Sequence, residues 1–335
     1  MDDKIISLAH GSGGKLMHDL IKGLFLSKFD NPLLSNLSDS AILNIAGAKL
    51  AFTTDTYVVK PIFFPGGDIG KLAVCGTVND LSVMGAKPLC LSCGLVIEEG
   101  FEYEMLEKVI DAMKVAACDA GIEIVTGDTK VVEKGKCDGL FINTSGVGVV
   151  EKKVLSLEDI QIGDKVIING GIGEHGIAVL SAREDLGLDS NIESDCASLN
   201  GLVSKIINSS DKVRFMRDPT RGGLATTLNE IVDRKDFGII IDEEKIPIKD
   251  YVKGTCELLG FDPLYIANEG KVVIVVAAED ASRVIDGMRG EPLGKDAEII
   301  GEVVSQHKGK VCMKTLSGGT RIVDMLTGEQ LPRIC

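Results

Sequence analysis

The strongest constraint on the fold is an alternation of short apolar segments with longer helix-like segments. In the first half of the chain, the apolar segments predict strands at residues 49–54, 88–97, 122–126 and 140–150. Between them, residues 68–84 and 103–120 predict helices; in the second of these, Leu106, Val109 and Met113 recur at helical spacing. Strands that alternate with helices are typical of α/β folds, here with mixed sheets.

The second half repeats this pattern after a polar segment that ends at Gly163-Asp164. We expect strands at residues 165–169, 237–242, 271–277, 297–304 and 310–314, and helices at 176–186, 197–207, 222–233 and 249–259. At roughly 150 residues per domain, the 335 residues predict two domains. We therefore predict an N-terminal domain at 1–155, a C-terminal domain at 156–315, and a flexible tail at 316–335 with little periodicity.

Charge and hydropathy exclude several classes of function. The chain has 36 Lys and Arg against 50 Asp and Glu, a net charge of −14, which opposes binding to nucleic acid or to an anionic membrane. No apolar stretch approaches the roughly 20 residues of a membrane span, and the N-terminus lacks the apolar core of a signal peptide. Nine cysteines without a disulfide-framework spacing fit a reducing compartment, so we expect a cytoplasmic protein.

Two short motifs are better explained by their place in the fold than by binding of a metal or a cofactor. Cys90 and Cys93 form a C-x-x-C pair inside an apolar segment, without the second pair or the histidines that a zinc site needs, so packing is favoured. Gly171, Gly173 and Gly176 match G-x-G-x-x-G, but a loop and a second helix follow where a dinucleotide fold requires a strand. No Walker motif is present.

Aspartates occur where apolar segments end or within a predicted helix. Asp39, Asp55, Asp80 and Asp128 are each flanked by Ser, Thr, Asn or Gly. Carboxylates that face one cleft could hold Mg²⁺ against the phosphates of a nucleotide. The alternative is that Asp favours turns and caps, and the residues alone leave both explanations open.

Three further segments are suited to binding or catalysis. Residues 10–14 (HGSGG) could close around phosphate oxygens, although they could also be a flexible terminus. Arg217 and Arg221 flank a Pro turn that precedes a helix, which suits an anion or an Arg–Asp ion pair equally. Glu269 lies just before a buried strand and could act as a general base or belong to a strand-end turn.

The chain ends in a cysteine. Cys335 closes a Gly- and Pro-containing segment that could extend about 50 Å from Thr320 at roughly 3.3 Å per residue. A sulfur on such a segment could visit an active site and then a partner protein. The neighbouring α-carboxylate raises and Arg333 lowers the pKa of such a thiol, so its reactivity does not follow from the sequence.

Together these segments resemble a known family. They are residues 10–14 (HGSGG), 63–73 (FFPGGDIGKLA), 127–132 (GDTKVV), 218–223 (DPTRGG), 267–271 (ANEGK) and 332–335 (PRIC). Over its whole length the chain closely resembles the HypE family of hydrogenase maturation factors. That family belongs to the ATP-binding superfamily of aminoimidazole ribonucleotide (AIR) synthetase and selenophosphate synthetase. The resemblance implies a two-domain fold whose N-terminal domains form a β-barrel across a homodimer, with ATP bound in clefts beside it.

The resemblance also implies a reaction. A HypF-like carbamoyltransferase would load Cys335, and ATP would then drive dehydration of the S-carboxamide to a thiocyanate. The cyanide would pass to iron on a HypC–HypD-like complex, for the [NiFe]-hydrogenase centre. The resemblance assigns Asp39, Asp55, Asp80 and Asp128 to Mg²⁺, and it assigns Gly11, Ser12, Gly13, Gly14, Asp55, Asp80, Asp128 and Thr129 to ATP. Glu269 and Lys130 match the family's candidates for handling protons. His10 could also carry a proton, although a lone histidine is more often structural.

One departure and two alternatives bear on this expectation. Many members of the wider superfamily have a Gly-Asp-Asp type motif where this chain has Ser38-Asp39-Ser40, with a single acid. A phosphotransferase similar to selenophosphate synthetase would be expected to carry a nucleophilic Cys in the N-terminal glycine-rich segment, and residues 10–20 contain none. A carrier without catalysis would hold the group on Cys335 and would not hydrolyse ATP.

Overall fold

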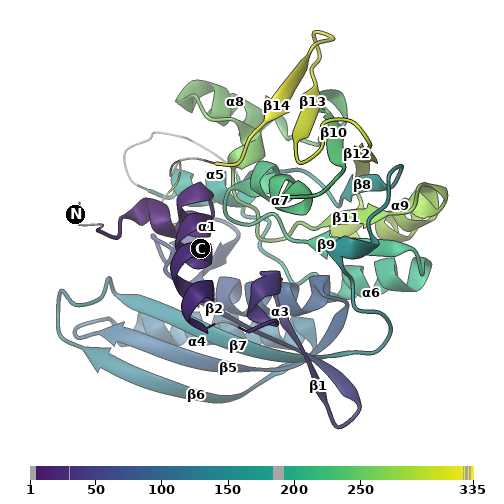
Figure 1. Ribbon diagram of the computed structural model, residues 1–335. Helices are drawn as coiled ribbons and strands as arrows, with labels where there is room; N and C mark the ends of the chain where they lie inside the picture. Colours follow the sequence, from purple (N-terminus) through teal and green to yellow (C-terminus); the bar gives the residue numbers. More distant parts are fainter. Residues whose placement is uncertain (1–4, 30, 184–191, 327, 329–330, 332) are drawn as a thin grey trace.

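The chain forms two α/β lobes with the C-terminus between them (Figure 1). The computed structural model describes residues 5–29, 31–183, 192–326, 328, 331 and 333–335. The N-terminal helices α1 (Lys15–Leu20) and α2 (Leu26–Phe29) lie near the C-terminus, beside the space between the lobes (Figure 1).

The first lobe is built on a five-stranded sheet of order β1-β2-β7-β5-β6. Its strands are β1 (Ala41–Ile45), β2 (Ala48–Tyr57), β5 (Ala86–Glu98), β6 (Glu123–Val132) and β7 (Leu140–Val150), and β3 (Phe63–Phe64) and β4 (Gly67–Asp68) form a separate hairpin. All neighbouring strands are antiparallel except β5 and β6, which α4 connects. Along β7 buried residues alternate with half-buried ones, because the helices of the described residues cover only one face of the sheet.

Two helices cover that face. Helix α3 (Ile69–Val83) is buried along most of its length, and the Asp68 side chain caps it by accepting hydrogen bonds from the amides of Gly70 (2.7 Å) and Lys71 (3.1 Å). Helix α4 (Tyr103–Ala120) buries one apolar stripe and ends at Gly121, whose φ of 67° suits glycine. Both helices match the residue ranges expected from the sequence to within one residue.

The second lobe contains a seven-stranded sheet of order β14-β13-β10-β12-β8-β11-β9. Its strands are β8 (Lys165–Ile168), β9 (Val213–Arg217), β10 (Gly238–Asp242), β11 (Val273–Val276), β12 (Glu298–Val304), β13 (Val311–Lys314) and β14 (Thr320–Val323). Its helices are α5 (Glu174–Ser181), α6 (Asn200–Ser209), α7 (Gly223–Val232), α8 (Asp250–Leu259) and α9 (Ala281–Arg289). Both neighbours of β8, the strands β11 and β12, are antiparallel to it, which agrees with the rejection of a dinucleotide fold at 171–176.

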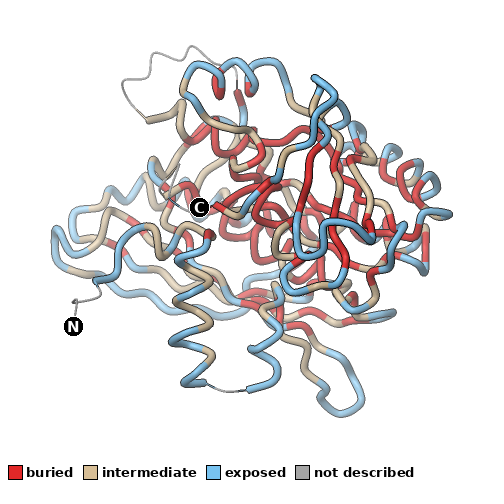
Figure 2. Tube along the Cα trace, turned by 45° about the horizontal axis from the view of Figure 1, so that its top comes forward, coloured by how far each residue is buried: buried red, intermediate tan, exposed pale blue. Residues whose placement is uncertain are grey.

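The second sheet is buried on both faces. Val166 of β8 belongs to a core cluster with α7, whereas the next residue, Ile167, belongs to a cluster with α6 and α9. The burial map shows the same concentration of buried segments in this lobe, whereas the N-terminal helices are exposed or half-buried (Figure 2). A third cluster centred on α3 includes Ile334 and Cys335, so the chain end packs against the first lobe.

The structure differs from the expected elements at several points. Strand β2 continues to Tyr57 and β6 to Val132, so Asp55 and Asp128 lie within strands and not after them. Strand β9 and helix α9 were not expected, and β14 lies within the segment 316–335 for which the sequence predicts a tail. Helix α5 ends at Ser181, and the end of the expected helix at residues 184–186 falls outside the described residues, as does Pro332.

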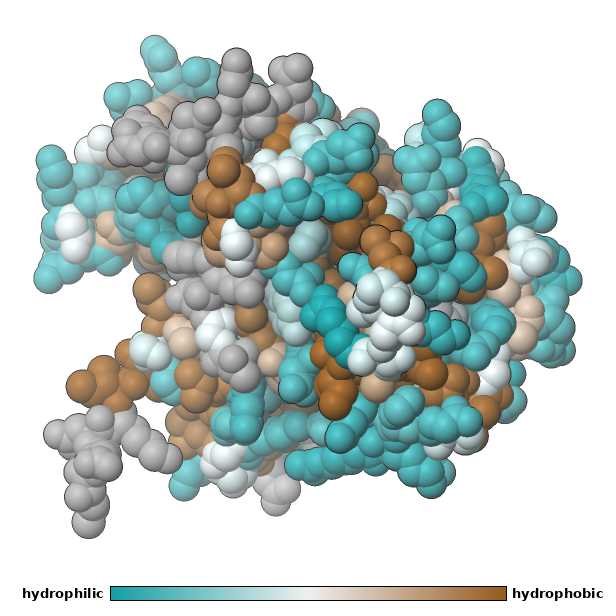
Figure 3. All heavy atoms as spheres, turned by 90° about the horizontal axis from the view of Figure 1, so that it is seen from above, coloured by the Kyte–Doolittle hydropathy of each residue, from teal (hydrophilic) through white to brown (hydrophobic). Residues whose placement is uncertain are grey.

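Within the described part of the chain, no helix is long and apolar enough to cross a membrane. Seen from above, the surface is mixed, with hydrophobic side chains scattered in small groups among hydrophilic ones (Figure 3).

Candidate active site

A cavity of about 690 Å³ is lined by residues of both lobes and of the N-terminal helices. Its acidic lining residues are Asp39, Asp55, Asp80, Asp218, Glu230 and Glu269. Cys335, the last residue of the chain, lines the same cavity. The cavity therefore brings together three of the four aspartates singled out in the sequence, the expected general base and the terminal sulfur.

The first lobe contributes three of these acids from three different elements. Asp55 lies in β2, Asp80 near the end of α3, and Asp39 just before β1. Thr53 connects two of them, because its hydroxyl lies 2.9 Å from a carboxylate oxygen of Asp80 and 2.8 Å from the backbone oxygen of Asp39. Packing of α3 on the sheet therefore places the Asp80 carboxylate at the cavity that Asp39 and Asp55 also line.

The second lobe contributes Asp218 and Glu269 from the ends of neighbouring strands. Arg217 of β9 pairs with Val273 of β11, so the residues that follow β9 and precede β11 meet at one edge of the sheet. Asn268 fixes the junction: its side-chain amide donates to the backbone oxygen of Pro219 (2.8 Å). Asp195 accepts hydrogen bonds from the amides of Glu269 (3.1 Å) and Gly270 (3.2 Å).

Burial and mutual repulsion raise the pKa values of the acids. Burial, with the charges of Asp218, Asp55 and Asp39, raises the pKa of Asp80 well above its usual range. Burial and the charge of Asp39 raise the pKa of Asp218 to about 7. Burial also raises the pKa of Glu269 well above its usual value, with further contributions from Asp218 and Asp195. Buried acids whose pKa values are shifted in this way are typical of functional sites.

Asp39 differs from its neighbours because it already has a cationic partner. Arg217 donates from Nε to the Asp39 carboxylate (3.0 Å) and from Nη1 to Glu230 (2.8 Å). Burial still raises the pKa of Asp39, although Arg217 opposes this effect. Arg217 therefore fits the ion-pair alternative considered in the sequence, whereas Arg221 has a different role.

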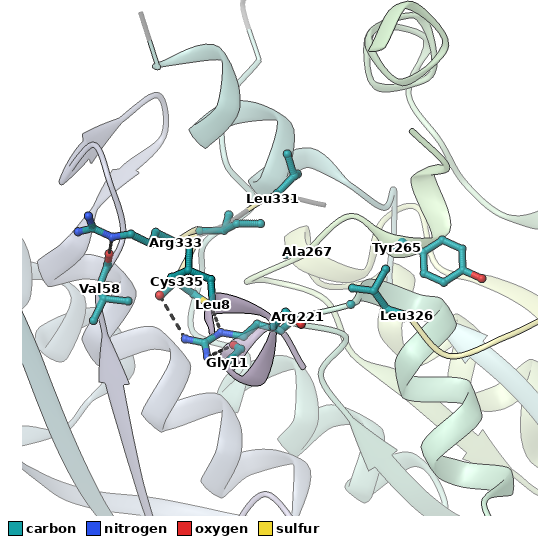
Figure 4. A pocket seen from close by; sticks show the side chains of 13 residues that line it. Leu8, Gly11, Val58, Arg221, Tyr265, Ala267, Leu326, Leu331, Arg333 and Cys335 are labelled. Atoms are coloured by element: carbon teal, nitrogen blue, oxygen red, sulfur yellow. Dashed lines mark hydrogen bonds between the residues drawn. The ribbon is translucent and has the colours of Figure 1, made fainter. Parts of the chain in front are cut away.

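Arg221 binds the terminal cysteine. Its Nε lies 2.8 Å from Sγ of Cys335, and its Nη2 lies 3.3 Å from the Cys335 backbone oxygen (Figure 4). Its Nη1 donates to the backbone oxygen of Gly11 (2.9 Å), which connects the N-terminal glycine segment to the same guanidinium. Burial raises the pKa of the Cys335 thiol to about 12, although Arg221 lowers it in part.

Backbone pairing with the first lobe also holds the end of the chain. The amide of Val58 donates to the Cys335 oxygen (3.3 Å) and the amide of Lys60 donates to the Arg333 oxygen (3.1 Å). The Arg333 side chain in turn donates to the Val58 oxygen (3.0 Å) and contacts Asp138. Cys335 therefore lies inside the site, a location that the sequence left open.

The N-terminal glycine segment lies against this docked end. Gly11 and Ser12 line a smaller cavity of about 170 Å³ next to Cys335, and Gly13 lines the large one. Gly14 is buried where a Cβ would come within 2.3 Å of the Leu326 oxygen, so only glycine fits there. His10 lines neither cavity, and its Nδ1 lies 2.9 Å from the Ser7 hydroxyl. The structure thus brings residues 11–14 to the site but leaves His10 beside it.

Three of the expected site residues lie elsewhere within this chain. Asp128, Thr129 and Lys130 are exposed on the edge strand β6, and Lys130 Nζ lies 2.6 Å from the Asp128 carboxylate. Hydrogen bonding from Lys130 lowers the pKa of Asp128. The expected set of four aspartates is therefore not assembled by one chain: Asp39, Asp55 and Asp80 line the cavity, and Asp128 does not.

The acids that line the cavity are of a type that could hold magnesium together with phosphate. Among the described residues, no three His, Cys, Asp or Glu side chains are arranged to hold a metal by themselves. Magnesium is commonly bound through one or two carboxylates together with substrate phosphates, and buried acids of raised pKa supply such ligands. Glu269 Oε1 is buried without a hydrogen-bond partner within the described structure, so the cavity also contains an acceptor that is not engaged.

Comparison with known proteins identifies the family. Models of the N-terminal and C-terminal domains of AIR synthase related proteins match residues 37–150 and 161–314. The carbamoyl dehydratase HypE of Bradyrhizobium diazoefficiens is 52% identical over 332 residues, which are 98% of this chain and 96% of that protein. This chain belongs to the HypE family.

Solved HypE structures have the same fold. A chain in a crystal structure of a HypE–HypF complex matches with a TM-score of 0.87 at 50% identity, covering 92% of this chain and 99% of that one. A crystal structure of HypE in complex with ATP matches with a TM-score of 0.83 at 46% identity, covering 98% and 100% of the two chains. These comparisons confirm the AIR synthetase-like fold and the HypE resemblance predicted from the sequence.

Sequence reasoning gave no role to two residues that the structure places at this HypE site, Asp218 and His175. Asp218 belongs to the segment 218–223, which carried the resemblance. His175 is buried in the first turn of α5 and contacts the docked chain end. For Arg221 the sequence left an anion and an ion pair equally open because of the adjacent Pro turn, whereas His175 lies in a glycine-rich segment discounted as a dinucleotide motif.

Proposed function

We propose that this chain is an ATP-dependent carbamoyl dehydratase acting on its own C-terminus. It converts an S-carboxamide on Cys335 to a thiocyanate and thereby supplies cyanide for [NiFe]-hydrogenase maturation. The observation that carries the proposal is that the terminal sulfur and the cluster of buried acids line one cavity. The naming of close relatives as carbamoyl dehydratase HypE, and the solved complex of a HypE with ATP, support the same assignment.

The reaction removes the amide oxygen together with both amide protons. A carboxamide oxygen is a poor leaving group, so it must first be phosphorylated; bound Mg-ATP supplies the phosphoryl group. Overall, R–S–C(=O)NH₂ and ATP give R–S–C≡N, ADP, phosphate and a proton. The C–O bond breaks and its electron pair leaves with the phosphate, and the bonding electron pairs of the two N–H bonds become the two π bonds of the nitrile.

We assign proton removal to Glu269. Its Oε1 is buried and has no partner among the described residues, and the Glu269 carboxyl and Cys335 line the same cavity. Its raised pKa makes the carboxylate a stronger base than an exposed glutamate. Arg221, which contacts the sulfur, holds the reacting group at this wall of the cavity.

Asp55 and Asp80 are the residues that we assign to magnesium. Both line the cavity, and burial raises the pKa of each, in Asp80 to a larger extent. A divalent cation would relieve their repulsion and neutralise charge on the nucleotide phosphates. Asp39 contributes less directly, because Arg217 already neutralises it. Residues 11–14, which lie beside Cys335, are placed to close over the phosphates.

A homodimer would explain why Asp128, Thr129 and Lys130 lie away from the cavity. Within the described part of the chain, helices leave one face of the first sheet uncovered, and β6 is an edge strand with Val125 and Val131 exposed to 58% and 67%. We propose that two copies pair through this sheet to form a barrel. Asp128, Thr129 and Lys130 would then complete a nucleotide site together with the second copy.

The proposed protein partners follow from the chemistry of the carbamoyl and cyanide groups carried on Cys335. A HypF-like carbamoyltransferase would load Cys335, in line with the solved HypE–HypF complex. A HypC–HypD-like complex carrying iron would receive the cyanide. Both exchanges require Cys335 to leave the buried position that Arg221 and Val58 hold.

The test measures the mass of the peptide that carries Cys335. The protein is loaded by the cognate carbamoyltransferase and compared before and after addition of Mg-ATP. Loss of one water in the presence of ATP supports the dehydratase. An adduct that persists points to a carrier without catalysis, and absence of any adduct contradicts loading at Cys335. Cys335→Ser, which replaces only the sulfur with oxygen, is the control that should take up no carbamoyl group.

A further inference from the structure

His175 is a fully buried histidine to which the reaction assigns no role. It lies in the first turn of α5, and both ring nitrogens are hydrogen-bonded. Nδ1 lies 2.8 Å from the Ser194 hydroxyl, and Nε2 lies 2.9 Å from the backbone oxygen of Ile334. His175 lines neither of the two cavities that Cys335 lines.

The partners of His175 determine which nitrogen carries the proton. The Ile334 oxygen can only accept a hydrogen bond, so Nε2 carries the hydrogen and Nδ1 accepts from the Ser194 hydroxyl. The Ser194 oxygen in turn accepts from the amide of Cys196 (3.1 Å). Burial lowers the pKa of His175, which favours this neutral form, and Phe64 packs edge-on against the ring at 5.4 Å. The ring is thus held in one orientation by packing and by hydrogen bonds.

The residue held by His175 is the one directly before Cys335. Arg221 binds the sulfur and oxygen of Cys335, while His175 binds the preceding carbonyl. Two contacts on consecutive residues restrict both the position and the rotation of the chain end. Without His175, the buried Ile334 carbonyl would lose its hydrogen-bond partner, and the docked position of the chain end would be disfavoured.

The same loop also positions the proposed base. Ser194 holds His175, and the next residue, Asp195, holds the amides of Glu269 and Gly270. Gly270 lies so close to this loop that a Cβ would meet the Asp195 oxygen at 1.9 Å. The loop at residues 194–196 is therefore a common support for the docked sulfur and for Glu269.

We propose that His175 is a positioning residue that holds the Ile334 carbonyl and so keeps Cys335 docked beside Arg221 and Glu269. The contribution of His175 to the reaction rests on the proposed function, whereas its contribution to docking does not. His175→Leu fills the space but cannot donate to the Ile334 oxygen. His175→Gln retains an N–H donor at a similar reach and should restore docking.

The first readout needs no ATP and no carbamoyl group. Iodoacetamide is added to the unmodified protein, and alkylation of Cys335 is followed by mass spectrometry of its peptide. We expect alkylation about 10-fold faster in His175→Leu, equivalent to about 1.4 kcal/mol of lost docking. We expect His175→Gln to stay close to wild type. Equal rates in His175→Leu and wild type would overturn the proposal, as would a His175→Gln variant as fast as His175→Leu.

Ser194→Ala keeps the proposal testable if His175→Leu does not fold. It removes only the hydroxyl that orients the ring, and we expect alkylation of Cys335 about threefold faster than in wild type, a loss of docking well below 1.4 kcal/mol. An unchanged rate in Ser194→Ala would then overturn the proposal. The melting temperature of each variant identifies the ones that fold.

The second readout is the rate of water loss from the carbamoyl-loaded protein. We expect His175→Leu to lower this rate about 10-fold without changing the KM for ATP, because His175 does not line the nucleotide cavity. A raised KM with an unchanged maximal rate would contradict a positioning role. If loaded wild type itself loses no water, the proposed function fails, while protection of Cys335 from alkylation still decides whether His175 positions the chain end.

Discussion

At the scale of single residues, the site is a cluster of buried acids whose ionisation is opposed by burial. Asp218, Asp80 and Glu269 all have raised pKa values, and the first cause for each is burial. Such groups weaken the fold whenever they are ionised, so functional chemistry and stability oppose one another here.

Asp218 gives a pH-dependent prediction. Its pKa of about 7 in the folded chain lies above the ordinary 3.8, so its contribution to stability is present at low pH and is lost as pH rises from about 4 to 7. Asp218→Asn should therefore raise the free energy of unfolding at pH 7.5 by up to about 4 kcal/mol in the absence of nucleotide and magnesium. At pH 4 the two proteins should be equal. Urea unfolding at the two pH values measures the difference, and an equal gain at both would contradict this account.

Glu269 gives a prediction about activity. Glu269→Gln has nearly the same shape but cannot accept a proton, so water loss from the loaded protein should slow by about 10²–10⁴-fold. ATP should still bind, because the Asp55 and Asp80 carboxylates remain. Single-turnover mass spectrometry measures the rate, and equilibrium binding of a labelled nucleotide provides the control. A variant that retains full activity would exclude Glu269 as the base.

At the scale of secondary-structure elements, α3 joins the two lobes through Asn79. Its side-chain amide donates to the backbone oxygens of Ala197 (3.1 Å) and Glu269 (3.2 Å), and its oxygen accepts from the amide of Leu199 (2.7 Å). One side chain of the first lobe thus supports both the loop at 194–199 and the proposed base.

Removing the Asn79 side chain should lower the stability of the protein. Asn79→Ala leaves buried backbone groups without partners and should lower the free energy of unfolding by about 2–4 kcal/mol. The matched control is Asn44→Ala at an exposed position of β1, where the change should stay within about 0.5 kcal/mol. Denaturant titration monitored by circular dichroism measures both. Equal stability of the two variants would show that Asn79 does not join the lobes.

The uncovered face of the first sheet gives a prediction about assembly. Val96 of β5 lies beside Lys130 of β6 and is 37% exposed in the single chain. Val96→Lys would bury a charge in the proposed dimer, so sedimentation velocity should find a monomer at concentrations where wild type is a dimer. Leu258→Lys on α8, where the leucine is 73% exposed, should leave the assembly unchanged. A monomeric wild type would contradict the proposed homodimer.

At the scale of the whole molecule, the cavity between the lobes couples ligand binding to stability. In the proposed site Mg-ATP contacts both lobes, so it should raise the free energy of unfolding by about 2.7 kcal/mol at 100 times its Kd. Asp80→Asn should remove most of the dependence on magnesium while leaving a smaller effect of ATP alone. Thermal melts with ATP alone, with magnesium alone and with both together measure the stabilisation that each gives. Equal stabilisation by ATP with and without magnesium would contradict the assignment of Asp80.

The local sequence pattern alone predicted those secondary-structure elements that bury a single periodic stripe of apolar residues. The range 103–120 for α4 was confirmed because Val109 and Met113 face the core at helical spacing, and Gly121 ends the helix in a backbone conformation suited to glycine. Strand β6 was placed too short because its residues are exposed on both faces, so no alternation marks its end. Strand β14 was missed because its pairing with β13 depends on a neighbour and not on its own sequence.

The sequence by itself determined the α/β class, the family resemblance and the residue types that the chemistry requires, because these depend on local periodicity and on short motifs. Only the tertiary structure decided that Asp218 joins Asp55 and Asp80, that Asp128 stands apart from them, and that Cys335 is docked against Arg221. These outcomes depend on hydrogen bonds and burial between residues up to hundreds of positions apart, and such contacts leave no periodic signal in either segment alone.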